Sequence, residues 1–248
     1  GVALRSTDLS ATTTELSTDG THIALAPSAT AEALGNALHV RLVGDVFAEN
    51  AIAAALALLS VGIDADTVRQ SLSSMQVVPG RFEVVHNSPL VAVDFAHTPD
   101  ALARTCATAR RLANGGRVIV VFGAGGARDK SKREPMGKVV GAGADVAVVT
   151  SDNPRNEDPA AIANALGAAA RAAGSARVLT VLDRRRAIEV ALEEARPPDV
   201  VVICGKGHEQ GQLVDGTTLP FSDAEVVLET LGVMPDPTPC RTEPYPCL

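Results

Sequence analysis

The amino-acid sequence predicts an α/β protein built on a Rossmann-like, mostly parallel sheet. Short β-branched, apolar runs alternate with loops and helical patterns about five times, at roughly thirty-residue spacing, which is typical of a doubly wound sheet. Hydrophobic residues make up 46% of the chain but aromatic residues only 2%, which favours helices packed closely on a sheet over an aromatic-rich β-sandwich. The runs that predict strands lie at residues 90–93, 118–122, 146–150, 178–182 and 200–204.

Capping signals predict the helices between these strands. Thr98 and Asp158 each precede a proline, the pattern of an N-cap followed by proline at the first helical position. Asp183 is the expected N-cap of another helix. Further helical segments are expected at residues 135–143, 159–173 and 224–231.

The first part of the chain has a different pattern. Residues 1–46 predict short strands, with an Asp-Gly turn signal at residues 19–20. Residues 49–61 form an alanine- and leucine-rich helix that is apolar on nearly every side and is therefore expected to be buried. Gly62 ends this helix, and Asp64 begins a second, shorter one.

Proline and glycine at residues 79–80 predict a domain boundary, which divides the chain into residues 1–79 and 80–234. The tail at residues 235–248 contains five prolines in fourteen residues, a composition that predicts disorder.

Charge and cysteine usage exclude several classes of protein. The formal net charge of −7 argues against nucleic acid as a partner. The chain has neither an 18-residue apolar run nor a signal peptide, so we expect a cytoplasmic protein without membrane insertion. Cys106 and Cys204 lie in apolar runs and are expected to be buried free thiols. Together with Cys240 and Cys247 they make four cysteines, whose spacing matches no metal-binding motif.

Four chemically rich loops follow predicted strands, at residues 94–99, 123–133, 152–158 and 205–210. Parallel strands place the loops at their carboxyl ends along one edge of the sheet, where ligands bind in open α/β folds. We therefore expect the four loops to form one site.

The loop at 152–158 suits an amino-acid ligand. Arg155 beside Asp152 matches a ligand that has both a carboxylate and an ammonium group. The alternative is a surface turn with a capping aspartate. In the loop at 123–133, Arg128 stands where a dinucleotide fingerprint needs its third glycine. Its glycines and basic residues suit an anionic ligand, and the alternative is a tight turn before a solvated basic run.

The other two loops carry acid, base and flexible backbone. Residues 205–209 combine glycines with lysine, histidine and glutamate, so they form either a ligand-binding loop or a glycine turn with a satisfied histidine. Asp94 and His97 suit a ribose hydroxyl or a magnesium-bound phosphate, although Asp94 could equally serve as a cap. No Walker A pattern occurs in the sequence.

Taken together, six motifs in order resemble the Mur ligase family, and in particular its meso-diaminopimelate-adding type. The resemblance covers about residues 40–232. The motifs lie at residues 50–54, 80–83, 94–100, 123–133, 152–155 and 205–209.

The resemblance implies ATP-dependent amide formation in peptidoglycan synthesis. ATP would phosphorylate the D-glutamate carboxylate of UDP-N-acetylmuramoyl-L-alanyl-D-glutamate, and the amine of meso-diaminopimelate would displace the phosphate, with Mg²⁺ on the phosphates. Residues 1–79 would be the end of the central ATP-binding domain, and residues 80–234 the C-terminal, amino-acid-binding domain.

The resemblance also implies roles for particular residues. Arg155 would bind the distal carboxylate of meso-diaminopimelate, a group that lysine lacks, while Asp152 and Glu209 would bind its distal ammonium. The amino-acid site would comprise Arg128, Asp152, Asn153, Pro154, Arg155, Gly205 and Glu209. The ATP site would comprise Asn50, Arg81, Asp94 and His97.

The chain also departs from the family pattern. The Walker A loop, the carbamylated lysine that binds magnesium and the domain that grips the uridine nucleotide would all precede Gly1. We therefore expect no catalytic residue here, no assignable metal ligand, and no activity of this chain alone. Two alternatives remain: another ligase of the Mur or folylpolyglutamate type, and a non-catalytic module that binds an amino acid.

Overall fold

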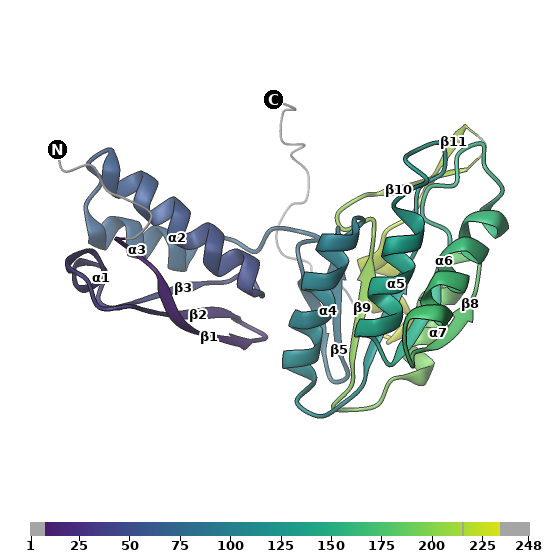
Figure 1. Ribbon diagram of the computed structural model, residues 1–248, viewed down its shortest axis with the longest axis horizontal. Helices are drawn as coiled ribbons and strands as arrows, with labels where there is room; N and C mark the ends of the chain where they lie inside the picture. Colours follow the sequence, from purple (N-terminus) through teal and green to yellow (C-terminus); the bar gives the residue numbers. More distant parts are fainter. Residues whose placement is uncertain (1–7, 215, 234–248) are drawn as a thin grey trace.

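The computed structural model describes residues 8–214 and 216–233, which form two lobes (Figure 1). The N-terminal lobe contains a three-stranded sheet, and the C-terminal lobe contains a six-stranded sheet and a two-stranded hairpin. The chain passes from one lobe to the other between Ser74 and Glu83, close to the boundary expected from Pro79 and Gly80. The assignment of residues 1–79 to the end of a central ATP-binding domain stays a prediction.

The N-terminal lobe has two layers, a sheet and a pair of helices. Its antiparallel strands pair in the order β1-β2-β3, and the Asp-Gly signal lies in the tight turn between β1 and β2. The helix α1 was not expected from the sequence, and Asp64 caps α3 as expected. The elements are β1 (Ala11–Ser17), β2 (Gly20–Leu25), α1 (Ala29–Ala33), β3 (Ala37–Val40), α2 (Asp45–Ser60) and α3 (Ala65–Ser74).

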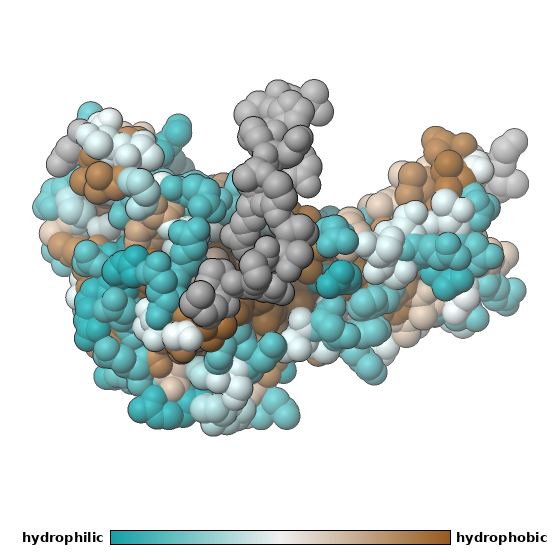
Figure 2. Space-filling model, turned by 180° about the vertical axis from the view of Figure 1, so that it is seen from behind, coloured by the Kyte–Doolittle hydropathy of each residue, from teal (hydrophilic) through white to brown (hydrophobic). Residues whose placement is uncertain are grey.

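The expectation that the alanine- and leucine-rich helix is buried was wrong. Only Ala48, Ala51 and Ala55 of α2 are buried, whereas Leu58 is 37% exposed and Val61, which caps the helix, is 76% exposed. In a two-layer lobe the helix packs one face on the sheet, so an apolar sequence alone does not bury the other side. Figure 2 shows brown, hydrophobic surface at the outer end of this lobe.

The C-terminal lobe confirms the predicted α/β class. Its sheet has the strand order β4-β5-β9-β6-β7-β8, in which all neighbours are parallel except the edge pair β4 and β5. The strands predicted at 118–122 and 200–204 have those bounds in the structure. The strands are β4 (Glu83–Asn87), β5 (Leu90–Asp94), β6 (Val118–Phe122), β7 (Val146–Val149), β8 (Arg177–Thr180) and β9 (Val200–Cys204).

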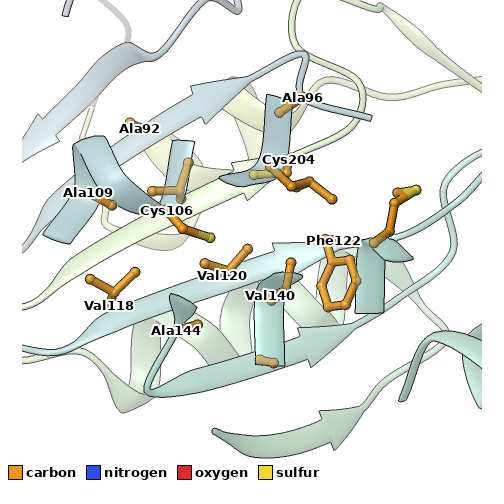
Figure 3. Packing of buried hydrophobic residues seen from close by; sticks show 14 of the residues in the cluster. Ala92, Ala96, Cys106, Ala109, Val118, Val120, Phe122, Val140, Ala144 and Cys204 are labelled. Atoms are coloured by element: carbon orange, nitrogen blue, oxygen red, sulfur yellow. The ribbon is translucent and has the colours of Figure 1, made fainter. Parts of the chain in front are cut away.

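Helices cover both faces of this sheet, so alternate residues of each strand enter two cores. Figure 3 shows the packing in the first of them. Thr98, Asp158 and Asp183 cap helices as the sequence predicts. The first core lies under α4 (Pro99–Ala113), α5 (Arg133–Gly143) and α6 (Pro159–Ala173), and the second under α7 (Arg184–Glu194) and α8 (Asp223–Thr230).

Cys106 and Cys204 are buried free thiols, as expected. Burial raises the pKa of Cys106 to about 11 and that of Cys204 well above its ordinary value, so both thiols are protonated at neutral pH. Cys240, Cys247 and the proline-rich tail lie outside the described residues. None of the described helices combines the length and hydropathy that crossing a bilayer requires.

A short hairpin, β10 (Gly211–Val214) with β11 (Thr217–Pro220), was not expected from the sequence. It extends from the loop that follows β9 and stands above the sheet, beside the loops that follow β6 and β7 (Figure 1). The sequence contains an Asp-Gly pair at residues 215–216, a hairpin signal that would have found it.

Candidate functional site

The four chemically rich loops meet at one edge of the sheet, as the sequence predicts. The strands β5, β9, β6 and β7 are direct neighbours in that order and run parallel. Their carboxyl ends therefore lie side by side, and the loops that follow them are in contact.

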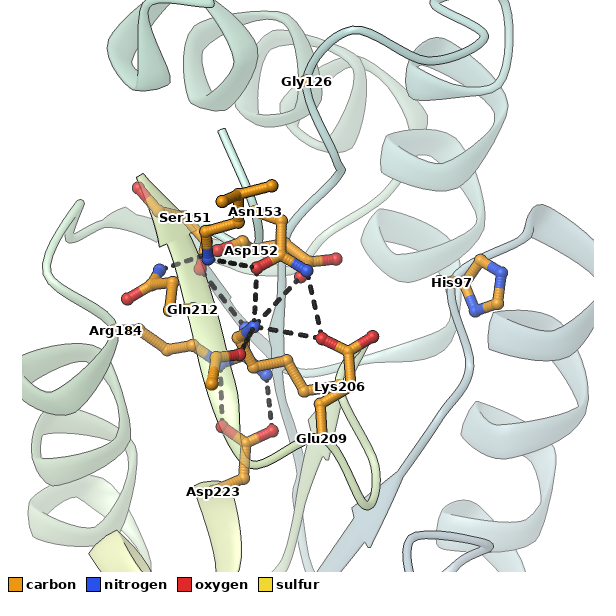
Figure 4. Close-up of polar contacts among 12 residues, drawn as sticks. His97, Gly126, Ser151, Asp152, Asn153, Arg184, Lys206, Glu209, Gln212 and Asp223 are labelled. Atoms are coloured by element: carbon orange, nitrogen blue, oxygen red, sulfur yellow. Dashed lines mark hydrogen bonds and ion pairs between the residues drawn. The ribbon is translucent and has the colours of Figure 1, made fainter. Parts of the chain in front are cut away.

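A buried lysine connects two of these loops (Figure 4). Lys206 follows β9, and its side chain is completely buried. Its Nζ atom donates to Asn153 Oδ1 at 2.9 Å, to the Gly211 carbonyl at 2.8 Å and to Glu209 Oε2 at 3.3 Å. The Asp152 carboxylate lies 3.8 Å from the same atom. Burial lowers the pKa of Lys206, and the two carboxylates oppose that shift.

Asn153 completes the connection between the loops. Its amide nitrogen donates to Glu209 Oε2 at 3.0 Å, and its amide oxygen accepts from the backbone of Leu213 at 2.8 Å as well as from Lys206. Asp152 is only 7% exposed, and its carbonyl accepts from Gln212. These hydrogen bonds join three segments into one polar unit: the loop after β7, the loop after β9 and the hairpin.

Arg155 lies at the other end of the same loop. Its backbone is in the left-handed region, with φ of 54°, and its amide donates to the Leu213 carbonyl. Its Nη1 atom donates to the carbonyls of Gly126 and Asn153, at 2.9 and 3.3 Å. Within the described residues no carboxylate pairs with this half-buried guanidinium.

Glycines allow the loops after β6 and β7 to approach closely. A Cβ atom on Gly126 would lie 1.9 Å from the carbonyl oxygen of Pro154, which is itself buried. A Cβ atom on Gly125 would lie 2.9 Å from Arg155 Nη1 and 3.8 Å from Arg128 Cγ. The two arginines therefore flank Gly125.

Most side chains of the basic run at residues 128–133, which the sequence predicts to bind an anion, already make contacts within the protein. Lys130 and Arg133 both pair with Glu157, and Lys132 donates to the His97 carbonyl. Arg128 is exposed and has no ion pair among the residues that the structure describes. Of this run, Arg128 is the cation that remains available to a ligand.

A completely buried ion pair lies beneath these loops (Figure 4). Arg184 at the start of α7 pairs with Asp223 at the start of α8, with both nitrogen–oxygen distances at 2.7 Å. The same guanidinium donates to the carbonyls of Cys204 and Ser151, the residues where β9 ends and the loop after β7 begins. The pair thus fixes the base of both loops.

Gly205 also allows the loops after β7 and β9 to contact each other. Its φ of 120° is a conformation that side chains rarely adopt, and a Cβ atom there would lie 3.3 Å from Asp152 Oδ2. Glycine therefore lets the chain turn out of β9 against Asp152.

The four residues expected to bind ATP line a separate cavity of about 470 Å³ between the lobes. Asn50 comes from α2 in the N-terminal lobe, whereas Arg81, Asp94 and His97 come from the C-terminal lobe. The sequence thus predicted a group of residues that the structure brings together, and their role in binding ATP stays a prediction.

Aromatic and charged groups are packed together in this cavity. Arg81 lies over the Phe95 ring at 4.7 Å, and the His97 ring makes an edge contact with Phe95 at 4.6 Å. Asp94 accepts from Thr105 Oγ1 at 2.5 Å and from the Phe82 amide at 3.4 Å. Burial raises the pKa of Asp94, against the effect of these hydrogen bonds.

The described residues that line this cavity include no group of three close metal ligands. Within the described part of the chain, the only group of three suitable metal ligands is Asp19, His22 and His39, which belongs to the N-terminal lobe.

Sequence reasoning missed the roles of Lys206, Arg184 and Asp223. Lys206 lies inside a motif that was recognised, but only its position directly after an entirely apolar strand hinted that it is buried. Arg184 and Asp223 are 39 residues apart, and no local pattern pairs them.

Comparison with known proteins identifies the family. The profile of the Mur ligase, glutamate ligase domain matches residues 80–207. This chain therefore belongs to the Mur ligase family. A solved structure of a UDP-N-acetylmuramoyl-L-alanyl-D-glutamate–2,6-diaminopimelate ligase is similar, with 34% sequence identity and a TM-score of 0.64. The match covers 91% of this chain and 45% of that one.

Curated relatives point to one branch of the family. The UDP-N-acetylmuramoyl-L-alanyl-D-glutamate–2,6-diaminopimelate ligase of Aquifex aeolicus is 45% identical over 194 residues, which cover 77% of this chain and 39% of that enzyme. The enzyme of the same name from Rhizobium meliloti is 43% identical over 198 residues, 79% of this chain and 40% of that enzyme. The chain spans about two fifths of the length of these relatives.

We predict that Lys206→Met destabilises the protein. Removal of the ammonium leaves the buried Asp152 carboxylate without its nearest cation, which should lower the free energy of unfolding by roughly 3 kcal/mol. Urea denaturation measures the change. Lys138→Met removes an exposed ion pair with Glu134 and should change the free energy of unfolding far less than Lys206→Met does. Equal effects of the two substitutions would contradict this role of Lys206.

We also predict a pH signature for Asp94. Burial raises the folded-state pKa of Asp94, so ionisation of this carboxyl destabilises the fold. This destabilisation is absent below the ordinary pKa of 3.8 and reaches its full size above the folded-state pKa. The free energy of unfolding of the wild type, minus that of Asp94→Asn, should therefore fall as the pH rises above the ordinary pKa of 3.8.

The control for this measurement has the opposite sign. Hydrogen bonds from Thr67 lower the pKa of the capping Asp64, so the same difference for Asp64→Asn should rise with pH. Denaturation curves at several pH values provide both slopes. A difference for Asp94 that grows with pH would show that its carboxyl is not destabilised by burial.

Proposed function

We propose that this chain is the amino-acid- and nucleotide-binding part of an ATP-dependent ligase that adds meso-diaminopimelate to UDP-N-acetylmuramoyl-L-alanyl-D-glutamate. The names of the curated relatives support this reaction. The observation that carries the proposal is the guanidinium of Arg155, which has no carboxylate partner among the described residues and lies in one polar unit with two carboxylates.

The charges of the loops match the side chain of meso-diaminopimelate. Its distal carboxylate fits the Arg155 guanidinium, which still has donors available because its hydrogen bonds to the described residues use Nη1 alone. Its distal ammonium fits Glu209, whose side chain is 37% exposed and can turn to a ligand, with the Asp152 carboxylate nearby. Arg128, on the other side of Gly125, can bind a second carboxylate.

Lys206 orients this site and is not proposed to bind the amino acid. It is buried behind the loop, and it holds Asn153 and Glu209 in their present positions. Its charge lies within 4 Å of both the Asp152 and the Glu209 carboxylates and offsets the repulsion between them.

Two-point binding of the distal end explains how the correct amine would react. When Arg155 and Glu209 hold the distal carboxylate and ammonium, the other amino group is the free nucleophile. That nitrogen attacks the acyl-phosphate carbon of the D-glutamate residue, the carbon–oxygen bond to phosphate breaks, and the amine loses a proton. The described residues position the nucleophile, while the acyl phosphate is made elsewhere.

The inter-lobe cavity is the proposed nucleotide site. Its volume of about 470 Å³ lies within the range for small-ligand pockets, and Arg81, Phe95 and His97 offer a cation and ring faces to a base or phosphate. Asp94 is placed to accept from a ribose hydroxyl, and Asn50 to hydrogen-bond the nucleotide from the other lobe. A folylpolyglutamate synthase from Mycobacterium tuberculosis with this fold was solved with ADP (TM-score 0.61, 23% identity).

A cytoplasmic location accords with this proposal. The nucleotide-linked substrate and ATP are cytoplasmic metabolites, and Cys106 and Cys204 are free thiols, as expected in a reducing compartment.

Calorimetry with the chain tests the amino-acid site. We predict that meso-diaminopimelate binds and that Arg155→Lys weakens binding by roughly 10- to 100-fold, because the bidentate, charge-assisted contact is lost. Arg171→Ala, which removes an exposed arginine of α6, should leave the dissociation constant unchanged.

L-Lysine distinguishes this reading from its alternatives. Because lysine lacks the distal carboxylate, it should bind the wild type weakly and should respond little to Arg155→Lys. Lysine binding as tight as that of meso-diaminopimelate, or an unchanged dissociation constant in Arg155→Lys, would refute the assignment of Arg155. Absence of any meso-diaminopimelate binding would refute the amino-acid site itself.

A further inference from the structure

Two histidines and an aspartate come together in the N-terminal lobe, far along the chain from the loops above. His22 of β2 and His39 of β3 are direct partners across the antiparallel sheet. Their rings stack with centroids 4.3 Å apart and planes inclined by 24°. Asp19 lies in the turn before β2, and one potential ligand atom from each of the three residues lies within 4.8 Å of the others.

The register of the sheet explains this meeting. Glu15 of β1 faces His22, and His22 faces His39, so the three side chains form a row on one face. Residues Ile23 and Leu38 point to the opposite face and are buried in the core. The row lines a hollow of about 330 Å³, which Arg69 and Ser73 of α3 also line.

One ring nitrogen of this cluster has no partner. The Nε2 atom of His39 is buried and makes no hydrogen bond with any described residue. A buried polar atom without a hydrogen bond destabilises the fold, so an atom of this kind often has a functional role. A metal ligand is one such reason, because an imidazole nitrogen that binds a metal must be free of other partners.

The turn before β2 keeps this nitrogen accessible to Asp19. A Cβ atom on Gly20 would lie 2.8 Å from His39 Nε2, and the φ of Gly20 is 149°, so glycine permits the close approach. Ser17 hydrogen-bonds the Asp19 carboxylate and thereby orients it.

We propose that Asp19, His22 and His39 bind a divalent transition-metal ion, with Zn²⁺ as the expected occupant. Two imidazoles and one carboxylate form a nitrogen-rich ligand set that suits Zn²⁺, Ni²⁺ or Cu²⁺ and disfavours Mg²⁺. Zinc–nitrogen bonds of about 2.0–2.1 Å require ligand atoms no more than about 4 Å apart. The exposed side chains of Asp19 and His22 can close the remaining distance by rotation.

The geometry also indicates what the ion does. It joins the turn between β1 and β2 to β3 and so stabilises the N-terminal lobe. Three protein ligands would leave a coordination position for water or another ligand, and Glu15, which also lines the hollow, adds negative charge. This site shares no residue with the proposed amino-acid or nucleotide site, so the two proposals stand or fall separately.

Metal titration of the untagged chain tests the inference. Cys240→Ser and Cys247→Ser are introduced first, so that the tail thiols cannot bind the ion, whereas Cys106 and Cys204 are buried. Calorimetry with Zn²⁺ should show one equivalent bound. His22→Ala and Asp19→Asn should each weaken binding by at least about tenfold. The control His86→Ala removes a histidine of β4 and should bind as the parent does.

Two further measurements guard against misfolding and against binding elsewhere. Co²⁺ bound at the site should give a visible spectrum without sulfur-to-metal charge transfer, and Asp19→Asn, an exposed substitution, should reduce it. Zn²⁺ should raise the melting temperature of the parent and of His86→Ala but not that of His22→Ala. Equal Zn²⁺ affinity in His22→Ala, Asp19→Asn and the parent, or no stoichiometric binding by the parent, would overturn the proposal.

Discussion

The buried ammonium of Lys206 is the interaction on which the arrangement of the loops depends. An unpaired charge in that position would be strongly unfavourable, so the surrounding loops must supply it with acceptors. They do so from three segments: Asn153 after β7, Glu209 after β9, and the Gly211 carbonyl where the hairpin begins. Because these acceptors belong to different segments, satisfying Lys206 fixes the segments relative to one another. The position of Arg155 follows, since its backbone bonds the hairpin and its side chain bonds Gly126.

This polar unit is anchored in the core of the lobe. The pair of Arg184 and Asp223 lies beneath it and holds the carbonyls at the ends of β7 and β9. The apolar helices and strands below therefore provide a rigid base, and the loops above it carry the charges of the proposed amino-acid site. Lys206 holds two of these charges, Asp152 and Glu209, in place before any ligand binds.

The sequence was sufficient to predict the fold class and the edge at which the loops gather, because both follow from local patterns. Alternating strands and helices imply parallel strands, and parallel strands place their loops together. The residues grouped in the inter-lobe cavity were also predicted, but through a family resemblance. Contacts between distant residues could not be predicted. Examples are the pairing of Arg184 with Asp223 and the cross-strand meeting of His22 with His39, which depend on register and packing. The burial of α2 was overestimated because hydropathy does not say how many layers cover a helix.

We propose that Lys206 and its partners position Arg155 and Glu209 to bind an amino acid with a carboxylate and an ammonium at its distal end. A crystal structure of the chain with meso-diaminopimelate tests this most directly. We predict that Arg155 binds the distal carboxylate and that Glu209 binds the distal ammonium, with the contacts from Lys206 to Asn153 and Gly211 unchanged. A ligand bound with its distal carboxylate away from Arg155, or a site in which Lys206 has left these partners, would contradict it.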